Sequence, residues 1–188
     1  VVMADEEQQR LPWLIADLIT KYNVTLMQCT PSRMRVLIED WNMRMALKKT
    51  RILTLAGEAL SPALLTKLQS ITTARIYNFY GPTETNVCTY YEVPATFPAE
   101  RTEPFPIGKD CSGDVCMVAD DRGQEVPHGE EGELFVKGGS VMRGYWNLPQ
   151  RNAEAFFIDK QGGRWYKTGD VVKVNAEGDY EYLGRRFG

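Results

Sequence analysis

The sequence predicts an α/β protein: a parallel sheet with flanking helices, followed by a small, mainly antiparallel β-sheet or barrel subdomain. Apolar residues in the first half alternate between helical spacing and short buried runs. The stretch 92–106 contains several prolines and is typical of a linker. In the second half, turn sequences separate short apolar runs. We therefore expect two domains, over residues 1–104 and 105–188.

Helices and strands alternate through the first half. Residues 11–22 place apolar side chains at helical intervals, and residues 24–27 form a β-branched and apolar run typical of a strand. Thr30 and Pro31 are expected to begin a second helix, as its N-cap and first-turn residue. The buried face expected for that helix consists of Met34, Leu37, Ile38 and Trp41.

Residues 51–56 and 75–79 are predicted strands on either side of a third helix. Ser61 and Pro62 begin that helix, whose apolar side carries Leu65, Leu68 and Ile71. The repeated helix–strand order predicts parallel strands joined by right-handed crossovers. Ligands of such sheets bind beyond the carboxyl ends of the strands. The strand ends that we expect to form a site are 28–30, 56–58 and 78–81.

The second half changes to the spacing of short strands. The strands that we expect are 115–119, 132–137, 164–174 and 179–183. Residues 120–123 and 175–178 are predicted hairpin loops. One short helix is expected over 149–157.

Composition excludes several classes of protein. The 188 residues are 43% hydrophobic and 25% charged, which is typical of a soluble globular protein and excludes overall disorder, collagen and coiled coil. The net charge of −3 argues against a nucleic-acid partner. No apolar run is long enough to span a membrane, and residues 1–7 do not resemble a signal peptide, so we expect a cytoplasmic location. The first residue is not Met, and we expect a longer parent protein.

The sequence gives little support for a zinc site or for nucleophilic catalysis of the Ser/His or Cys/His type. The four cysteines include no CxxC pair, and the single histidine, His128, is expected in a surface loop, so a zinc site is not expected. The acidic residues over 130–133 are expected to form a solvated face.

Residues 78–85 carry unusual chemistry directly after a predicted strand. The Asn78 amide can bind a purine edge, an aromatic ring can stack on a base, and Glu84 is a hard oxygen ligand that suits Mg²⁺. A Gly-Pro turn with Thr83 as an N-cap explains the same residues without a ligand. From the residues alone, both interpretations stay open.

Two further segments are weaker candidates. Asp170 follows a Gly turn, and its carboxylate can accept two hydrogen bonds from a vicinal diol such as ribose, although an ordinary strand turn is an alternative. The glycines of 138–146 can approach a phosphate, but no phosphate-loop pattern is present. Tight backbone packing at a sheet edge is the better interpretation of that segment.

Five segments together resemble the motifs of adenylate-forming enzymes, in the order of that superfamily. Residues 77–86 resemble its adenine and magnesium motif, and residues 55–60 its AGEAL segment. Residues 132–145 resemble its GELxxxGxxxxxGY segment, 165–170 its YxTGD motif and 183–186 the start of its GRxD hinge. The sequence of residues 78–94 is most similar to that of amino-acid adenylation domains, which belong to non-ribosomal peptide synthetases or to free-standing enzymes. Acyl- and aryl-CoA ligases are the alternative.

The resemblance implies a two-step reaction that uses ATP and Mg²⁺. An amino acid or other carboxylate becomes an acyl-adenylate with release of pyrophosphate, and the acyl group then passes to the phosphopantetheine thiol of a peptidyl carrier protein. By the same resemblance, Asn78 and Tyr80 hold adenine, and Thr83 contacts phosphate while Glu84 binds Mg²⁺. Asp170 binds the ribose hydroxyls. The remaining nucleotide-binding residues that it implies are Gly57, Glu58, Phe79, Gly81, Tyr182 and Arg185.

The resemblance also implies a pocket for the substrate side chain. The residues expected to line it are Gln28, Thr54, Ala56, Phe79, Val87 and Cys88. None carries a formal charge, which disfavours a strongly charged substrate side chain. Ordinary sheet packing is the alternative for most of them.

The sequence also departs from the superfamily pattern. The Gly/Ser/Thr-rich phosphate loop and the early pocket segment with its aspartate are missing, as are the C-terminal lid and its lysine. Phe187 stands where the hinge Asp is expected. We therefore expect a fragment that resembles the later part of the large subdomain and does not catalyse adenylation alone. A shortened, inactive homologue that binds a nucleotide or a partner protein is the second alternative.

Overall fold

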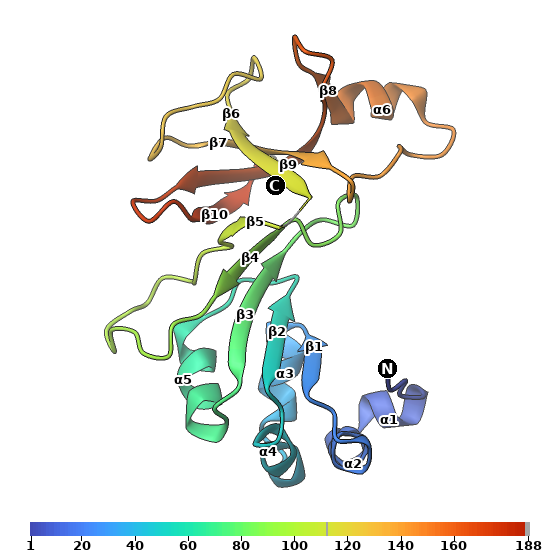
Figure 1. The fold of residues 1–188 in the computed structure, drawn as a ribbon, viewed down its shortest axis with the longest axis vertical. Helices are drawn as coiled ribbons and strands as arrows, with labels where there is room; N and C mark the ends of the chain where they lie inside the picture. Colours follow the sequence, from blue (N-terminus) through green and yellow to red (C-terminus); the bar gives the residue numbers. More distant parts are fainter. Residues whose placement is uncertain (112, 187–188) are drawn as a thin grey trace. The chain divides into compact units, whose positions relative to one another are not determined.

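The computed structural model describes residues 1–111 and 113–186, and Phe187 lies outside the described residues. The chain divides into two compact units (Figure 1). Unit 1 combines Val1–Asn78 with Glu92–Phe105, and unit 2 combines Phe79–Tyr91 with the chain from Pro106 onward. Residues 79–91 thus group with the second unit, whereas the sequence boundary at 104/105 placed them in the first domain. The division into domains at that boundary stays a prediction.

Unit 1 contains five helices among the described residues. They are α1 (Glu6–Arg10), α2 (Pro12–Tyr22), α3 (Pro31–Leu37), α4 (Trp41–Leu47) and α5 (Pro62–Ile71). The predicted starts at Thr30 and Ser61 are confirmed, because each hydroxyl accepts a hydrogen bond from a main-chain N–H of the first turn. A proline in the first turn of α2, α3 and α5 loses no helical bond there.

The prediction of a single helix through Trp41 is wrong. Helix α3 ends at Leu37, and Asp40 caps a new helix by accepting a hydrogen bond from the Met43 main-chain N–H at 2.9 Å. Trp41 is therefore the first residue of α4, and it is 66% exposed instead of buried. The other three residues of the predicted face, Met34, Leu37 and Ile38, are buried as expected.

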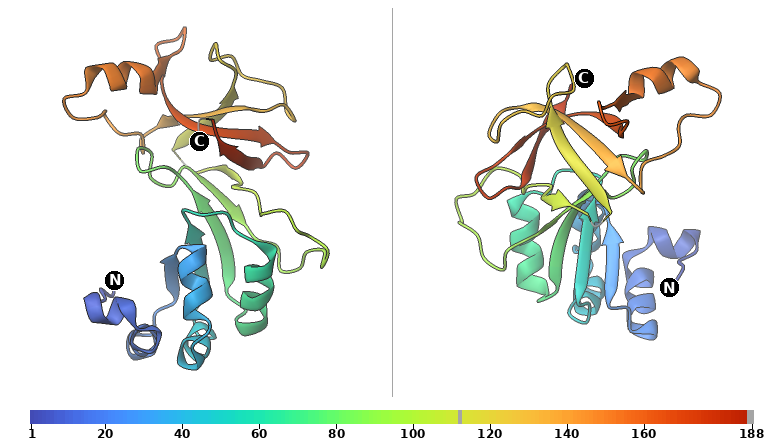
Figure 2. Two further views of the ribbon diagram at one scale, coloured as in Figure 1. Left: turned by 180° about the vertical axis from the view of Figure 1, so that it is seen from behind. Right: turned by 45° about the horizontal axis from the view of Figure 1, so that its top comes forward.

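The first sheet has the order β1-β2-β3-β4-β5. Its strands are β1 (Leu26–Cys29), β2 (Ile52–Ala56), β3 (Arg75–Tyr80), β4 (Thr89–Glu92) and β5 (Lys109–Asp110). The expected parallel pairing is confirmed for β1 and β2, whereas β4 and β5 pair antiparallel, so the sheet is mixed. Helix α3 lies over one face of β1 and β2, as seen from opposite sides in Figures 1 and 2.

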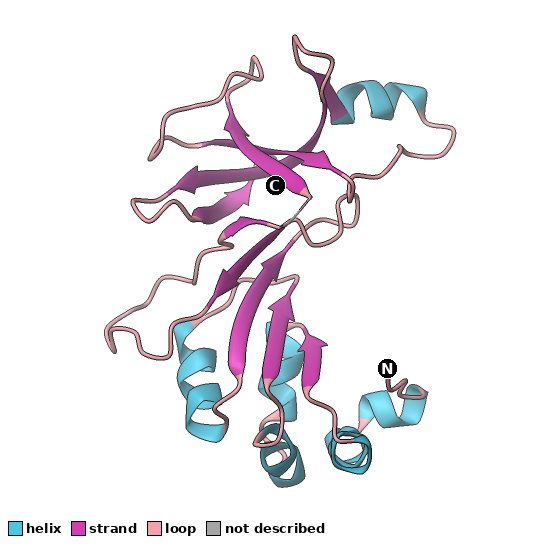
Figure 3. Ribbon diagram, in the orientation of Figure 1, coloured by secondary structure: helices cyan, strands magenta, loops and turns pink. Residues whose placement is uncertain are grey.

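Unit 2 contains the predicted antiparallel sheet. Its strands are β6 (Asp114–Ala119), β7 (Gly132–Gly138), β8 (Phe156–Ile158), β9 (Arg164–Val174) and β10 (Tyr180–Arg185), in the order β10-β9-β7-β6 with β8 beside β9. Helix α6 (Pro149–Ala155) precedes β8 (Figure 3). The helix predicted to reach residue 157 is thus shorter, because Phe156 already pairs with Tyr166 of β9.

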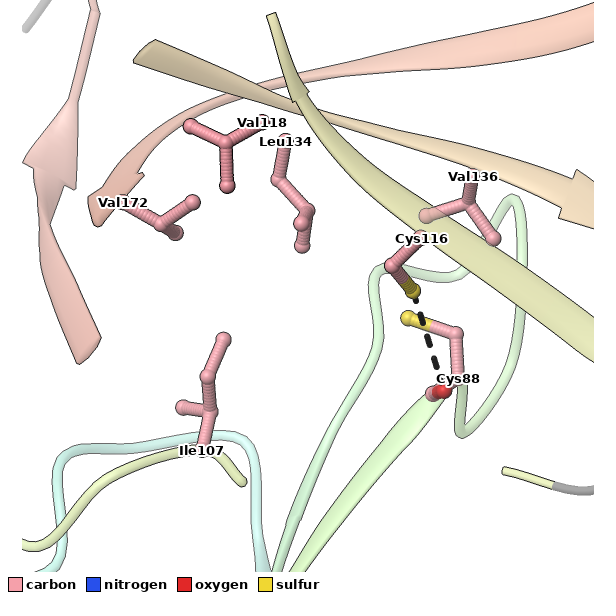
Figure 4. Close-up of a cluster of buried hydrophobic side chains, with 7 residues drawn as sticks. All are labelled: Cys88, Ile107, Cys116, Val118, Leu134, Val136 and Val172. Carbon is pink, nitrogen blue, oxygen red and sulfur yellow. Dashed lines mark hydrogen bonds between the residues drawn. The ribbon is translucent and has the colours of Figure 1, made fainter. Parts of the chain in front are cut away.

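Alternation along the strands places the core of unit 2. Leu134 and Val136 of β7 share one face and are fully buried, and they pair in register with Val118 and Cys116 of β6. These four residues form one cluster with Cys88, Ile107 and Val172 (Figure 4). The side chain of Phe135, which points to the other face, packs with Ala119 and Trp165. Burial on both faces fixes the register of β7, because a one-residue slip would exchange the two sets.

Among the described residues, no helix combines the length and the apolar character needed to cross a membrane.

Candidate functional site

Asp170 is a buried carboxylate with both oxygens engaged inside unit 2. Its side chain is only 6% exposed. The Tyr80 hydroxyl donates to Oδ2, and Arg185 Nη1 donates to Oδ1 at 2.9 Å. The same Arg185 nitrogen donates to the carbonyl of Thr168, also at 2.9 Å. The structure therefore brings together three of the predicted nucleotide-binding residues.

The local backbone explains this placement. Asp170 lies on β9 opposite Arg185 on β10, and the pairing register shifts between Tyr182 and Gly184. Gly169 has a φ of 73°, a conformation that glycine adopts without strain, so the chain can turn immediately before the carboxylate. The buried Thr168 hydroxyl accepts a hydrogen bond from the Asp170 N–H at 3.1 Å.

The surroundings of Tyr80 favour a neutral phenol beside the Asp170 carboxylate. Burial and the Asp170 charge raise the pKa of Tyr80, so that its hydroxyl stays protonated and donates. The hydrogen bond to Asp170 raises the pKa of Arg185. The rings of Tyr80 and Tyr182 lie 6.2 Å apart, centroid to centroid. The Arg185 side chain is 58% exposed, whereas the Asp170 carboxylate is buried.

A tight loop carries Thr83 and Glu84. The main-chain N–H of Cys88 donates to the Tyr80 carbonyl at 2.9 Å, which closes the loop. A Cβ at Gly81 would lie 1.6 Å from the carbonyl oxygen of Asn86, so only glycine fits. No helix begins in this loop, and Thr83 is exposed, so the N-cap interpretation of Thr83 is wrong.

Glu84 is the candidate ligand for Mg²⁺. One of its carboxylate oxygens, Oε1, accepts a hydrogen bond from the Tyr145 hydroxyl at 2.7 Å, and its side chain is half-buried. Within 1–111 and 113–186, no group of three or more His, Cys, Asp or Glu side chains could hold a metal. The residues present fit Mg²⁺ that takes one protein carboxylate and completes its shell with phosphate and water oxygens.

In unit 1, Glu58 has a structural partner. Ser32 donates to its carboxylate twice, from its main-chain N–H at 2.9 Å and from its hydroxyl at 2.6 Å. These bonds lower the pKa of Glu58, the hydroxyl bond contributing most. Gly57, with a φ of 88°, forms the turn that leads to Glu58. Asn78 is buried within β3, and it is the last residue of that strand that groups with unit 1.

The predicted pocket residues of unit 1 share one face of the sheet. Gln28 is in register with Thr54 across β1 and β2, and Ala56 follows Thr54 by two positions. The Thr54 hydroxyl oxygen is buried and, among the described residues, has no hydrogen-bond partner. A polar ligand group or a water molecule would satisfy it. The role of Gln28, Thr54 and Ala56 in a substrate pocket stays a prediction.

The pocket residues of unit 2 are packed differently from one another. Cys88 is fully buried, and its sulfur lies beside that of Cys116 in the core cluster (Figure 4). Phe79 and Val87 are half-buried. Core packing therefore accounts for the position of Cys88, and a role in a pocket stays a prediction for all three.

The sequence did not predict two residues beside the candidate site, Tyr145 and Glu133. Glu133 was expected on a solvated face, which is wrong, because it is 7% exposed and Arg186 donates to its Oε2 at 2.7 Å. Its Oε1 accepts a hydrogen bond from the Gly169 N–H at 2.9 Å. The period-two alternation along β7, which pairs Glu133 with buried Phe135 on one face, was the available signal. Glu133 and Arg186 also line a cavity of about 600 Å³. None of the predicted site residues lines this cavity.

Comparisons with known proteins identify the family of the chain. The family described as AMP-binding enzyme matches residues 1–146. The L-proline–(L-prolyl-carrier protein) ligase of Pseudomonas fluorescens is 37% identical over 177 residues, which are 93% of this chain and 33% of that protein. A dimodular nonribosomal peptide synthase of Bacillus subtilis is 35% identical over 98% of this chain and 8% of that protein. The chain thus spans a third or less of these relatives.

Solved structures give the same result. The crystal structure of CmiS6 superposes with a TM-score of 0.88 at 26% identity, and the match covers 97% of this chain and 45% of that one. The N-terminal subdomain of NpsA from Klebsiella oxytoca, solved with 3-hydroxybenzoyl-AMSN, gives a TM-score of 0.80 at 25% identity over 98% of this chain and 46% of that one. The family match, the relatives and the fold lead to one conclusion: the chain belongs to the AMP-binding enzyme family.

Proposed function

We propose that the chain is part of an ATP-dependent enzyme that activates an amino acid and loads it onto a carrier protein. The observation that supports this most strongly is the 37% identity, over 93% of the chain, to a ligase named for an amino acid and its carrier protein. In the proposed first step, a substrate carboxylate oxygen attacks the α-phosphorus of ATP, and the bond to pyrophosphate breaks. In the second, the phosphopantetheine thiol attacks the acyl carbonyl, and AMP leaves.

The proposed role of Asp170 is to accept hydrogen bonds from the ribose hydroxyls. Its burial and its fixed partners support this role, because an oriented carboxylate binds a diol without first losing side-chain freedom. Tyr182 and Arg185 complete this half of the proposed site. The proposed nucleotide contacts of unit 1 are Gly57, Glu58 and Asn78. Those of the loop side of unit 2 are Phe79, Tyr80 and Gly81.

The proposed role of Glu84 is to hold Mg²⁺, with Thr83 contacting a phosphate oxygen. When bound, Mg²⁺ neutralises the charge that develops on the leaving pyrophosphate. Thr83 is exposed and Glu84 is partly exposed, which is compatible with these contacts. The other residues of the chain orient the reacting groups, which is the main contribution of a protein to such a transfer.

Amino-acid-dependent exchange of pyrophosphate into ATP tests the proposal in the longer protein that contains this chain. We expect one or a few amino acids to support exchange, and Asp170→Ala to lower kcat/KM for ATP by about tenfold or more, since each bond to a charged group contributes roughly 1.5–3 kcal/mol. Asp179→Ala, in the β9–β10 turn, is the matched control and should leave the rate unchanged. If no amino acid supports exchange, the proposal is wrong.

An aromatic acid is a second candidate substrate. The NpsA subdomain, a 25% identical neighbour, was solved with a 3-hydroxybenzoyl adenylate mimic. The same assay therefore includes 3-hydroxybenzoate, and loading assays compare coenzyme A with a carrier protein as the acceptor. Exchange with aryl acids alone, or transfer to coenzyme A alone, would favour an acyl- or aryl-CoA ligase. Nucleotide binding without any exchange would favour an inactive homologue.

A further inference from the structure

Tyr145 and its neighbours hold Glu84 at two points. Tyr145 lies between β7 and α6, and its hydroxyl donates to Glu84 Oε1 at 2.7 Å. The main-chain N–H of Met142 donates to the Glu84 carbonyl at 2.8 Å. One short segment, residues 142–145, therefore fixes both the backbone and the carboxylate of Glu84.

The segment 142–145 is itself anchored to two secondary-structure elements. Asn152 of α6 accepts a hydrogen bond from the Tyr145 N–H at 2.7 Å and donates one to the Tyr145 carbonyl at 2.9 Å. Arg164 of β9 donates to the carbonyls of Met142 and Arg143, at 3.1 and 2.8 Å. A connection bound in this way holds the Tyr145 hydroxyl in one place, as a positioning group requires.

The charge of Glu84 is not neutralised by its protein partners. In the described part of the chain, no lysine or arginine forms an ion pair with Glu84. The donor to its Oε1 is the Tyr145 hydroxyl, which carries no positive charge. A carboxylate oriented by neutral donors keeps its full charge for an external cation.

We propose that Tyr145 is a positioning residue that orients the Glu84 carboxylate for Mg²⁺. The hydrogen bond to Oε1 restricts the rotation of the carboxylate. This inference rests on the proposed function, in which Glu84 holds Mg²⁺, and it adds a determinant of metal affinity outside the loop 81–88. Loss of such an outer partner typically weakens metal binding by about 10- to 100-fold.

The test compares Tyr145→Phe with Tyr180→Phe in the longer protein. Tyr180→Phe is the matched control, because it also removes one phenolic donor of unit 2, a bond of 3.1 Å to the carbonyl of Cys116 in the core. Mn²⁺ binding in the presence of ATP is measured by electron paramagnetic resonance, and the Mg²⁺ dependence of pyrophosphate exchange is measured in parallel. We expect Tyr145→Phe to raise the Mn²⁺ Kd and the half-saturating Mg²⁺ concentration about 10- to 100-fold, with kcat at saturating Mg²⁺ nearly unchanged.

Glu84→Gln separates the two levels of the proposal. If Glu84→Gln leaves the metal dependence unchanged, the proposed role of Glu84 fails. If Glu84→Gln shifts it and Tyr145→Phe does not, only the inference on Tyr145 fails. A Tyr145→Phe shift that persists in the Glu84→Gln background would also overturn it, because Tyr145 would then act independently of Glu84. Should Tyr145→Phe not fold, as judged by circular dichroism, Asn152→Ala replaces it: a raised Mn²⁺ Kd supports the inference and an unchanged one overturns it.

Discussion

The hydrogen bond from Tyr80 to Asp170 should contribute measurably to the stability of unit 2. Tyr80→Phe removes the donor to Oδ2 and leaves Asp170, whose side chain is 6% exposed, with Arg185 on Oδ1. A hydrogen bond to a charged group contributes roughly 1.5–3 kcal/mol, and a buried oxygen that loses its partner keeps its desolvation cost. We therefore expect the free energy of unfolding to fall by about 2 kcal/mol. For a chain of this length, that corresponds to a decrease in Tm of roughly 4–8 °C.

A double-mutant cycle with Asp170→Asn, followed by urea unfolding and circular dichroism, assigns the loss to this pair. The expected coupling energy is about 1–2 kcal/mol, within the range for residues in one hydrogen-bond network. Tyr90→Phe, at an exposed position of β4, is the control and should change stability by less than about 0.5 kcal/mol. Because the pKa of Tyr80 is raised, the loss should persist at pH 9, where Tyr80 is still protonated. Additive single-mutant effects would refute the reasoning.

Three further predictions concern the candidate site and its surroundings. Gly81→Ala should destabilise the chain by about 3 kcal/mol or more in urea unfolding, because its Cβ would meet a main-chain oxygen at 1.6 Å, whereas Gly139→Ala, with no atom within 4 Å, should be nearly neutral. Ser32→Ala should raise the pKa of Glu58 toward its ordinary value in a carboxyl NMR titration. The lowered pKa of Glu58 stabilises the folded state at pH values above the ordinary carboxylate pKa, and this contribution is lost as the pH falls. Ser32→Ala should therefore lose less stability than the unchanged protein when the pH is lowered through that range. An equal loss contradicts this assignment. Burial raises the pKa of Cys29 to about 11, so its alkylation rate should rise about tenfold per pH unit from pH 8 to 10 instead of levelling off near pH 9.

Local signals were sufficient for most of the fold. The helical spacing of 11–22 and the alternation of 132–137 each depend on neighbours in the sequence, and both elements were predicted with small errors at their ends. The same reasoning missed the break before Trp41, because Asp40 interrupts an apolar spacing that continues on either side of it. Strand β8 has only three residues, and it exists because β9 offers it a partner, which no local pattern reveals.

For the candidate site, sequence reasoning identified single residues better than their partners. Asp170 and Arg185 are 15 positions apart, and motif resemblance named both. The partner of Glu84 is 61 positions away, at Tyr145. Glu133 looked like one member of an acidic surface run, and its burial depends on Arg186, 53 positions away. Such pairings follow from sheet order and strand register, which one sequence without a structure does not supply.

The buried Glu133 shows how the candidate site keeps its geometry. Burying a carboxylate to 7% exposure is costly unless both oxygens have partners. In Glu133, one oxygen accepts a hydrogen bond from the Gly169 main-chain N–H and the other from Arg186. The main-chain N–H of Arg186 in turn donates to the Gly169 carbonyl at 2.8 Å. Both main-chain polar groups of Gly169 are therefore engaged. Gly169 immediately precedes Asp170, and the turn that presents the Asp170 carboxylate is therefore fixed by protein contacts alone. A carboxylate held in this way loses little freedom when it binds a diol, which is the physical reason to expect Asp170 to be preorganised for a nucleotide.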